Sequence, residues 1–342
     1  MSSAESEQFL EQFPEVAFAF AYGSGAVTQA GYQYSAGDPS QLPLLDAILV
    51  VEDSAKWHEE NMLRNPTHYT PLLPLSAKYV ARFQDQIPAH LWFNTYVMIT
   101  SGQLRGRMMK YGVINKQHML NDLCDWVDLY VAGRLQKPVH ILKSCKDIET
   151  AMKTNLESAV RASLLMLPER FNEIDLYLSV ASLSYVGDPR MYFGENPKKV
   201  RNLVTPIVGH YQALYQDPVR KLLLDKALPT STTQSISPAE HPVDCTLQNK
   251  ELKGFVYEQS PSDRWSLCLD LPLKMRRLLQ LKNREKYIEG AKPPAPAAVR
   301  TAVSAIVARS ASMQTIKGMF MVGMFKGTHY FLQKVKKRFG AR

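Results

Sequence analysis

The sequence predicts an α+β protein: a mixed-sheet domain, then a helical domain, then a basic tail. Short apolar runs that end at turns dominate residues 1–145, and helical spacing of apolar residues dominates residues 146–290. A proline-rich linker opens the last segment, residues 291–342. A chain of 342 residues is also longer than one hydrophobic core usually organises, so we expect two compact units and an appendage.

The first domain is expected to open with a short helix over residues 1–13 and then to mix strands with helices. Apolar runs bounded by turn residues or by changes of pattern are typical of buried strands, and longer stretches with helical spacing are typical of helices. Strands are predicted at residues 16–22, 44–51, 91–99, 107–113 and 139–141, and helices at 54–63 and 119–129.

The second domain is expected to consist of helices. Helical patterns cover residues 146–167, which end before Pro168, and residues 172–184. Most of residues 200–226 and the basic stretch 271–286 are also predicted as helix. Between them, residues 227–261 are rich in Pro, Ser and Thr and are expected to form an exposed loop.

The positive charge of the chain is concentrated in its tail. The net charge is +9, yet no Asp or Glu follows Glu289, and ten Lys or Arg lie beyond it. The first 290 residues therefore carry a net charge of about −1. A basic tail indicates an anionic partner, either nucleic acid or an acidic lipid surface.

The tail also alternates basic with apolar residues, and we expect residues 297–342 to form a detachable appendage. If residues 328–339 are helical, Phe331, Leu332 and Val335 share one side, with lysines around them. Such a helix can lie in the headgroup layer of an anionic membrane. A terminal helix docked on the protein's own core is the alternative, and the absence of acidic residues favours the membrane.

Other features bound the class of protein. No apolar run approaches the roughly 20 residues of a membrane-spanning helix, so any membrane role is expected to be peripheral. The four cysteines form no CxxC pair and are expected to be reduced thiols. The acidic start has neither the apolar core of a secretion signal nor the Arg-rich face of a transit peptide.

A glycine turn and a buried carboxylate provide the strongest chemical signal. Gly23, Ser24 and Gly25 follow a predicted strand, and Asp46 interrupts the next apolar strand. Glycines let backbone N–H groups approach phosphate oxygens, and a neighbouring carboxylate can hold Mg²⁺ against them. These are working parts of a nucleotidyltransferase. An ordinary turn beside a paired carboxylate is the structural alternative.

A second metal ligand is not evident from the sequence. Polymerase-type sites usually carry two carboxylates at positions i and i+2 of one strand, but the residue two after Asp46 is Ile48. A second ligand would have to come from elsewhere, and Asp53 is better explained as a helix cap. The acidic candidates are Glu52, Asp53, Asp122, Asp125 and Asp128.

Cations are needed to neutralise transferring phosphates. Lys110, Arg134 and Lys137 lie near predicted strand or helix ends, where sites of this class are built. Asp188 and Arg190, in a turn between two helices, could be a base and a phosphate clamp. From the residues alone, solvated surface cations are the preferred explanation of the three basic residues. Spacing does not decide between a functional pair at Asp188 and Arg190 and an ion pair that closes the turn.

Six segments, in order along the chain, together resemble the mitochondrial phosphatidate cytidylyltransferase family, also called the mitochondrial translocator assembly and maintenance proteins. The string Ala-Gly-Arg-Leu-Gln-Lys-Pro is the most specific part, and the glycine turn is the least specific. The likeness covers roughly residues 12–325. The segments are residues 22–25, Asp46 in its strand, 110–112, 129–138, 184–188 and 314–318.

The resemblance implies a nucleotidyltransferase-like domain, a winged-helix-like helical domain and a membrane-binding tail. It implies transfer of CMP from CTP to phosphatidic acid with Mg²⁺, yielding CDP-diacylglycerol for phosphatidylglycerol and cardiolipin synthesis. It also implies peripheral attachment to the matrix side of the mitochondrial inner membrane. On the matching positions, Gly23, Ser24 and Gly25 would bind the triphosphate, Asp46 the metal, and Lys110, Arg134 and Lys137 phosphates, with Asp188 as a candidate base or second metal partner.

The last expectations concern the need for a general base and two alternative functions. The phosphate of phosphatidic acid is already largely ionised near neutral pH, so a strong general base such as Asp188 is less necessary. A nucleotidyltransferase acting on RNA is one rival, with the tail as an RNA arm. A non-catalytic maintenance factor of the mitochondrial import machinery is the other. The aliphatic tail favours lipid over nucleic acid, and the oligomeric state is left open.

Overall fold

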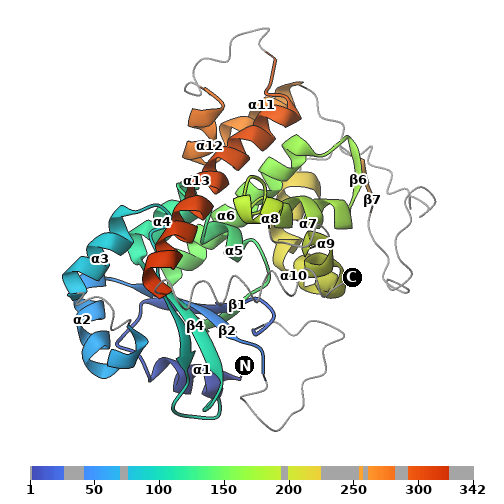
Figure 1. Ribbon diagram of the computed structural model, residues 1–342. Helices are drawn as coiled ribbons and strands as arrows, with labels where there is room; N and C mark the ends of the chain where they lie inside the picture. The colour runs from blue at the N-terminus through green and yellow to red at the C-terminus, as the bar shows by residue number, and fades with distance from the viewer. Residues whose placement is uncertain are drawn as a thin grey trace.

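In the computed structural model, a five-stranded mixed sheet lies at one end of the molecule and helices build the rest (Figure 1). The predicted α+β class is therefore confirmed. The structure describes residues 2–26, 42–69, 76–193, 199–224, 254–256, 261–281 and 292–322. Within these residues no helix is both long enough and apolar enough to cross a membrane.

The sheet has the order β3-β4-β2-β1-β5. Its central pair, β2 (Leu45–Val51) and β4 (Met108–Asn115), is parallel. The neighbouring strands β1 (Phe18–Tyr22), β3 (Trp92–Met98) and β5 (His140–Lys143) pair antiparallel. All five strands were predicted to within about three residues of their ends, because each is an apolar run closed by a change of pattern.

The alternation of side chains assigns each strand residue to one face of the sheet. One face carries Ala47, Leu49 and Val51 of β2 and packs against α1 (Ser3–Leu10) and α2 (Ser54–Arg64). The other face carries Ile48 and Val50 and joins the core of the helical part. Asp46, two residues before Ile48, belongs to this second face, which looks toward the helices.

The helical part is centred on α6 (Lys146–Met166), which is buried along much of its length. Helices α7 (Glu173–Ser182), α10 (Val208–Val219) and α11 (Pro261–Leu269) pack around it. The other helical elements are α3 (Ala77–Gln86), α4 (Lys116–Asp125), α5 (Ala132–Leu135), α8 (Pro189–Phe193), α9 (Lys199–Val204) and α12 (Leu273–Leu278), with single turns at Pro66–His68, Thr205–Ile207 and Arg220–Leu224.

One hydrophobic core runs from the sheet into the helical part. It joins Phe20 and Ile48 of the sheet to Leu164 of α6 and Tyr215 of α10 without a break. The division near residue 145 therefore marks a change of secondary structure rather than a gap between two cores. The two-domain organisation stays a prediction.

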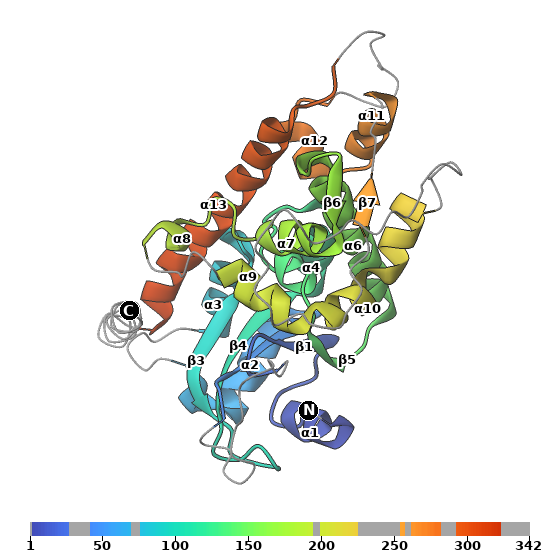
Figure 2. The same cartoon turned by 90° about the vertical axis from the view of Figure 1, so that its right-hand side faces the viewer.

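The last helix differs most from expectation. Helix α13 (Pro296–Val322) runs along one side of the molecule, from α12 to the edge of the sheet at β3 (Figure 2). Val299, Val303 and Ile306 are buried in the main core. The expectation that residues 297–342 form a detachable appendage is therefore wrong for the described part of this segment. Helix α13 packs an apolar face against the core, whereas the proline-rich linker before it had suggested a separate segment. Residues 323–342, with the predicted amphipathic helix 328–339, lie outside the described residues.

Other elements differ in detail. Helix α3 was not predicted, and the stretch predicted as one helix over 200–226 is divided into α9, two single turns and α10. A short strand, β7 (Gly254–Val256), lies within the expected loop 227–261 and pairs with β6 (Arg170–Asn172). Most of that loop, and residues 282–286 of the predicted basic helix, lie outside the described residues. Cys124, Cys145 and Cys268 are free thiols, as expected.

Candidate active site

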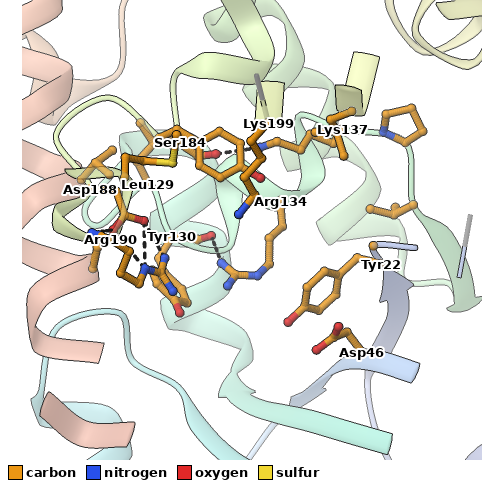
Figure 3. A pocket seen from close by; sticks show the side chains of 18 of the residues that line it. Tyr22, Asp46, Leu129, Tyr130, Arg134, Lys137, Ser184, Asp188, Arg190 and Lys199 are labelled. Carbon is orange, nitrogen blue, oxygen red and sulfur yellow. Dashed lines mark hydrogen bonds and ion pairs between the residues drawn. The ribbon is translucent and has the colours of Figure 1, made fainter. Parts of the chain in front are cut away.

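A cavity of about 310 Å³ opens between the sheet and the helical part. Its wall is polar and strongly basic on several sides and contains seven of the nine residues predicted from the sequence as site residues, all but Ser24 and Gly25 (Figure 3). The charged and hydroxyl-bearing residues that line it are Tyr22, Asp46, Lys110, Tyr130, Arg134, Lys137, Ser184, Tyr185, Asp188, Arg190, Lys199, Tyr211 and Ser310.

Three side chains of the sheet form one wall of this cavity. Tyr22 pairs across β1 and β2 with Asp46, and Asp46 pairs across β2 and β4 with Lys110. The three residues share the face that looks toward the helices, and Lys110 lies over the ring of Phe93 at 4.3 Å from its centroid. A carboxylate thus sits between a phenol and an ammonium at the end of the central strands.

The glycine turn lies beside Asp46, as the sequence predicted. Gly23 has φ +75°, and a Cβ there would lie 3.8 Å from Oδ2 of Asp46. Gly25 has another role: a Cβ would meet the backbone oxygen of Leu44 at 2.2 Å, so glycine is needed for close packing. Arg107 holds this turn by donating to the carbonyl oxygens of Gly25 and Pro43 at 2.7 and 2.9 Å. Gly25 and Ser24 do not line the cavity.

Arg134 projects from α5 into the middle of the cavity. Its Nη1 donates to the backbone oxygen of Tyr130 at 2.6 Å, and its guanidinium lies over the rings of Tyr130 and Tyr22 at 4.1 and 5.2 Å. Burial would lower the pKa of Arg134, but the two tyrosines raise it above the usual range. A planar cation fixed by two aromatic rings is well suited to bind phosphate oxygens.

The electrostatics of the cavity favour an anion. Burial would lower the pKa of Lys110, but Tyr22 and Asp46 outweigh burial and raise it. Burial would raise the pKa of Tyr130, yet Arg134, Arg190 and Lys110 together lower it. The raised pKa of Lys110 reflects the acidic groups beside it, whereas the lowered pKa of Tyr130 reflects a positive potential that stabilises negative charge. Phosphate groups placed here would meet cations already in position.

Lys137 lies one helical turn beyond Arg134. Its Nζ donates to the backbone oxygen of Gly133 and to Oγ of Ser184, both at 2.6 Å. Burial, followed by the charges of Arg134 and Lys199, lowers the pKa of Lys137 to about 7. Burial, together with the neighbouring cations, therefore holds this ammonium close to its point of deprotonation.

Asp188 and Arg190 form the ion pair that closes the turn between α7 and α8. Arg190 donates from Nε to both carboxylate oxygens, at 3.0 and 3.1 Å, and from Nη2 to Oδ2 at 2.6 Å. Burial would raise the pKa of Asp188, but these hydrogen bonds to Arg190 lower it. A carboxylate with a lowered pKa is a poor proton acceptor near neutral pH, so the contacts favour a role in orienting Arg190.

Asp122 organises the loop that presents Arg134. The carboxylate is 4% exposed, and its two oxygens accept all five backbone N–H groups of residues 128–132 at distances between 2.6 and 3.1 Å. The loop contains Leu129 in the left-handed region, with φ 49°. Asn155 of α6 holds the end of the loop by donating to the backbone oxygen of Ala132 at 2.9 Å.

We therefore expect Asp122→Asn to cost about 3 kcal/mol of unfolding free energy, because an amide nitrogen would replace one acceptor and oppose buried N–H donors. Chemical denaturation followed by circular dichroism measures the loss. Asp53→Asn is the matched control: Asp53 caps α2 by accepting from the N–H of Lys56 at 3.0 Å, and asparagine caps a helix equally well. A loss at Asp122 as small as at Asp53 would refute the organising role.

Of the acidic residues considered as second metal ligands, Asp188 lines the cavity, whereas Glu52, Asp53, Asp122, Asp125 and Asp128 do not. Asp122 and Asp53 have the roles just given, and Asp128 accepts from His90 Nδ1 at 2.6 Å. Glu52 pairs with Lys116 at 3.0 Å. Asp46 and Asp188 are the carboxylates of the cavity wall.

The residues present fit a magnesium nucleotide better than an all-protein metal site. In the part of the chain that the structure describes, no cluster of three or more His, Cys, Asp or Glu could hold a metal ion. Mg²⁺ is commonly bound by one or two carboxylates together with substrate phosphates and water. Asp46, on the same face as Tyr22 and next to the Gly23 turn, provides a carboxylate where phosphates can approach.

Sequence reasoning missed several residues of the wall. Lys199, Tyr185 and Tyr130 line the cavity, as do Ser310 and Ala311 of α13. Ser310 and Ala311 lie far along the chain from the other cavity residues, so nothing in the sequence indicated that they would be close in space. No motif around Lys199 singled it out. Tyr130 and Tyr185 lay inside the recognised segments 129–138 and 184–188, so the signal was present but not used.

Comparisons with known proteins agree on one family. A family model described as "Phosphatidate cytidylyltransferase, mitochondrial" matches residues 6–337. A Xenopus laevis protein of that name is 35% identical over 344 residues, which cover 96% of this chain and 93% of the relative. Proteins of the same name from Mus musculus and Dictyostelium discoideum are each 33% identical over 96% of this chain, covering 93% and 83% of their own lengths.

Proposed function

Because the chain belongs to the mitochondrial phosphatidate cytidylyltransferase family, we propose that the cavity between sheet and helices is its active site. The protein is an enzyme that transfers CMP from CTP to phosphatidic acid, forming CDP-diacylglycerol and pyrophosphate. One observation carries the location: Asp46 lies beside the Gly23 turn and Lys110 in a cavity with further cations.

The reaction joins two polyanions. A phosphate oxygen of phosphatidic acid forms a bond to the α-phosphorus of CTP, and the bond from that phosphorus to the bridging oxygen breaks, releasing pyrophosphate. The nucleophilic oxygen is already largely ionised near neutral pH, so the barrier lies mainly in charge repulsion. Lys110 and Arg134 therefore act by neutralising and orienting the phosphates.

Asp46 and the glycine turn are assigned to the triphosphate. The backbone at Gly23 lets phosphate oxygens approach without a Cβ between them. Asp46 would hold Mg²⁺, which when bound neutralises charge on the triphosphate and its leaving group. Arg190, oriented by Asp188, adds a cation at the opposite wall.

This reaction needs no protein base. Asp188 holds Arg190 and has a lowered pKa, so its assignment as a base has no support from its contacts. We retain Asp188 as a residue that orients a phosphate-binding cation. Ser24 and Gly25 were predicted to bind the triphosphate with Gly23, and this role stays a prediction. Neither lines the cavity, so we propose that they position Gly23, with Gly25 needed for packing.

Finer features of fold and location are also proposals. The mixed sheet that carries Asp46 is consistent with a nucleotidyltransferase-like domain, and the β6–β7 pair beside helices is a candidate for the wing of a winged-helix-like domain. The protein is mitochondrial, as its relatives are named. Peripheral attachment to an anionic membrane through the basic residues 323–342 is supported by the charge of that segment, and the matrix side is proposed from the family resemblance alone.

Turnover with purified protein tests the function. CTP and dioctanoyl phosphatidic acid, with Mg²⁺, should give CDP-diacylglycerol and pyrophosphate in equal amounts. A water-soluble short-chain substrate keeps membrane binding out of the measurement. Replacing CTP with ATP or GTP provides the specificity control. A folded protein that binds CTP but forms no CDP-diacylglycerol would contradict the proposal.

A further inference from the structure

The cavity has two charged regions on opposite sides, one with Asp46 and Lys110 on the sheet and one with Lys137 and Lys199 on the helical part. In Figure 3, Tyr22 and Asp46 lie on one side, Lys137 and Lys199 on the other, and Arg134 between them. In this reaction phosphatidic acid must approach the α-phosphorus of CTP from the side opposite the leaving pyrophosphate. The two charged regions therefore raise the question of which substrate each receives.

The sheet side suits the nucleotide. Asp46 there repels a phosphate unless a cation lies between them, which is the arrangement of a magnesium triphosphate. A bare phosphate monoester, which needs no metal to bind, would be disfavoured beside this carboxylate.

The helical side is built for an anion without a metal. Nζ of Lys137 lies 4.9 Å and Nζ of Lys199 5.0 Å from the ring centroid of Tyr185, so one aromatic ring positions both ammonium groups. Lys137 is fixed further by its bonds to Gly133 and Ser184. An ammonium has three N–H donors, and these two contacts leave one for a ligand.

The chain is shaped to bring these groups together. A Cβ at Gly133 would lie 2.4 Å from Cβ of Ser184, so only glycine lets α5 approach the turn after α7 this closely. That approach sets the 2.6 Å bond between Lys137 and Ser184. The cluster is thus a specific arrangement of three chain segments.

The neighbourhood also suits a lipid. Leu203, on the same helix α9 as Lys199, lines the cavity. Ile207 of the following turn and Tyr211 of α10 also line it. Apolar side chains next to a pair of cations match a phosphate monoester attached to a glycerolipid better than the hydrated phosphates of a nucleotide.

We propose that Lys137 and Lys199, with Ser184 and Tyr185, form the subsite that receives the phosphate monoester of phosphatidic acid, while the sheet side receives CTP. This assignment rests on the proposed function. Its consequence is that the two substrates depend on different cations. The lowered pKa of Lys137 agrees with it, because a dianion placed between the lysines relieves their mutual repulsion.

Steady-state kinetics of Lys199→Met test the subsite, with dioctanoyl phosphatidic acid as the lipid. We expect the KM for this lipid to rise about tenfold, as for loss of one bond to a charged group, and the KM for CTP to change less than twofold. Lys199→Arg should restore most of the affinity. Lys221→Met, at an exposed lysine paired with Glu157, is the surface control and should leave both constants unchanged.

The pH dependence gives a second readout. Raising the pH removes the proton of Lys137, so affinity for phosphatidic acid should fall above about pH 7–8 in the wild-type enzyme. Besides Lys137, the charged and titratable groups facing this position are Arg134, Tyr185 and Lys199. Lys137→Arg stays charged, so its affinity should persist to higher pH. Comparing the two enzymes at each pH cancels the titration of the lipid itself.

The possible results of these experiments distinguish a failure of the subsite proposal from a failure of the proposed function. A rise in the KM for CTP with that for the lipid unchanged, or a fall in kcat alone, would overturn the subsite while leaving the activity intact. Were the wild type inactive, calorimetric binding of dioctanoyl phosphatidic acid to wild type and Lys199→Met would still test it. Glycerol 3-phosphate should compete with the lipid and not with CTP, whereas equal competition by inorganic phosphate would indicate a general anion site and refute lipid recognition.

Discussion

Asp46→Asn is expected to lower kcat by on the order of a thousandfold while the protein stays folded, since a bound metal contributes several kcal/mol of charge stabilisation. Asn keeps the shape of the side chain but loses the charge that would hold Mg²⁺ beside the Gly23 turn. Asp188, the other carboxylate of the cavity wall, is bound by Arg190 and has no position to substitute for it. Pyrophosphate release from CTP and dioctanoyl phosphatidic acid measures the effect.

Two controls test whether the effect of Asp46→Asn is specific to this position and to metal binding. Asp125→Asn makes the same chemical change on α4, away from the cavity, and should leave turnover within about twofold of wild type, as for a surface substitution. Raising the Mg²⁺ concentration should recover part of the lost rate only if Asp46 contributes to metal affinity. A near-normal rate for Asp46→Asn would remove the assigned metal role and leave Lys110 and Arg134 as the main catalytic groups.

The sheet wall of the site was predictable because its residues follow one another through neighbouring strands. Gly23 directly follows β1 and Asp46 is the second residue of β2, so an antiparallel pair places them together. Lys110 joins them through the parallel pairing of β2 and β4, which the sequence did not predict.

The helical wall was not predictable in the same way. Lys199 reaches the cavity from α9, and its approach to Lys137 depends on how α7, α9 and α10 pack. No periodicity in one sequence encodes such a contact between distant segments. Asp122 illustrates the same limit: its acidity suggested a metal ligand, whereas its five backbone bonds appear only in the folded chain.

Helix α13 shows how composition can mislead. The tail has no acidic residue and follows a proline-rich linker, which suggested a detachable segment. Yet Val307, Ser310 and Ala311 of α13 line the cavity, and Ser310 donates to the backbone oxygen of Asp128 at 2.7 Å. Helix α13 is therefore part of the site wall.

The contact between α13 and the turn that carries Asp188 depends on a single glycine. Gly187 has φ +82°, and a Cβ there would lie 2.3 Å from Oγ and 2.6 Å from the backbone oxygen of Ser304. We expect Gly187→Ala to cost about 3 kcal/mol of unfolding free energy, part from the left-handed backbone and part from overpacking. Turnover should also fall, because Asp188 and Arg190 move with the turn.

Gly106→Ala separates the two causes. Gly106 has a similar φ of +89°, but no atom lies within 4 Å of its Cβ position, so alanine there should cost about 1 kcal/mol from backbone strain alone. Ser304→Ala added to Gly187→Ala removes the clash with the hydroxyl and leaves the clash with the backbone oxygen, so the rescue should be partial. Urea denaturation gives the three free energies. Equal losses at Gly187 and Gly106 would mean that α13 does not approach the turn closely, and the site would then lack the wall that α13 provides.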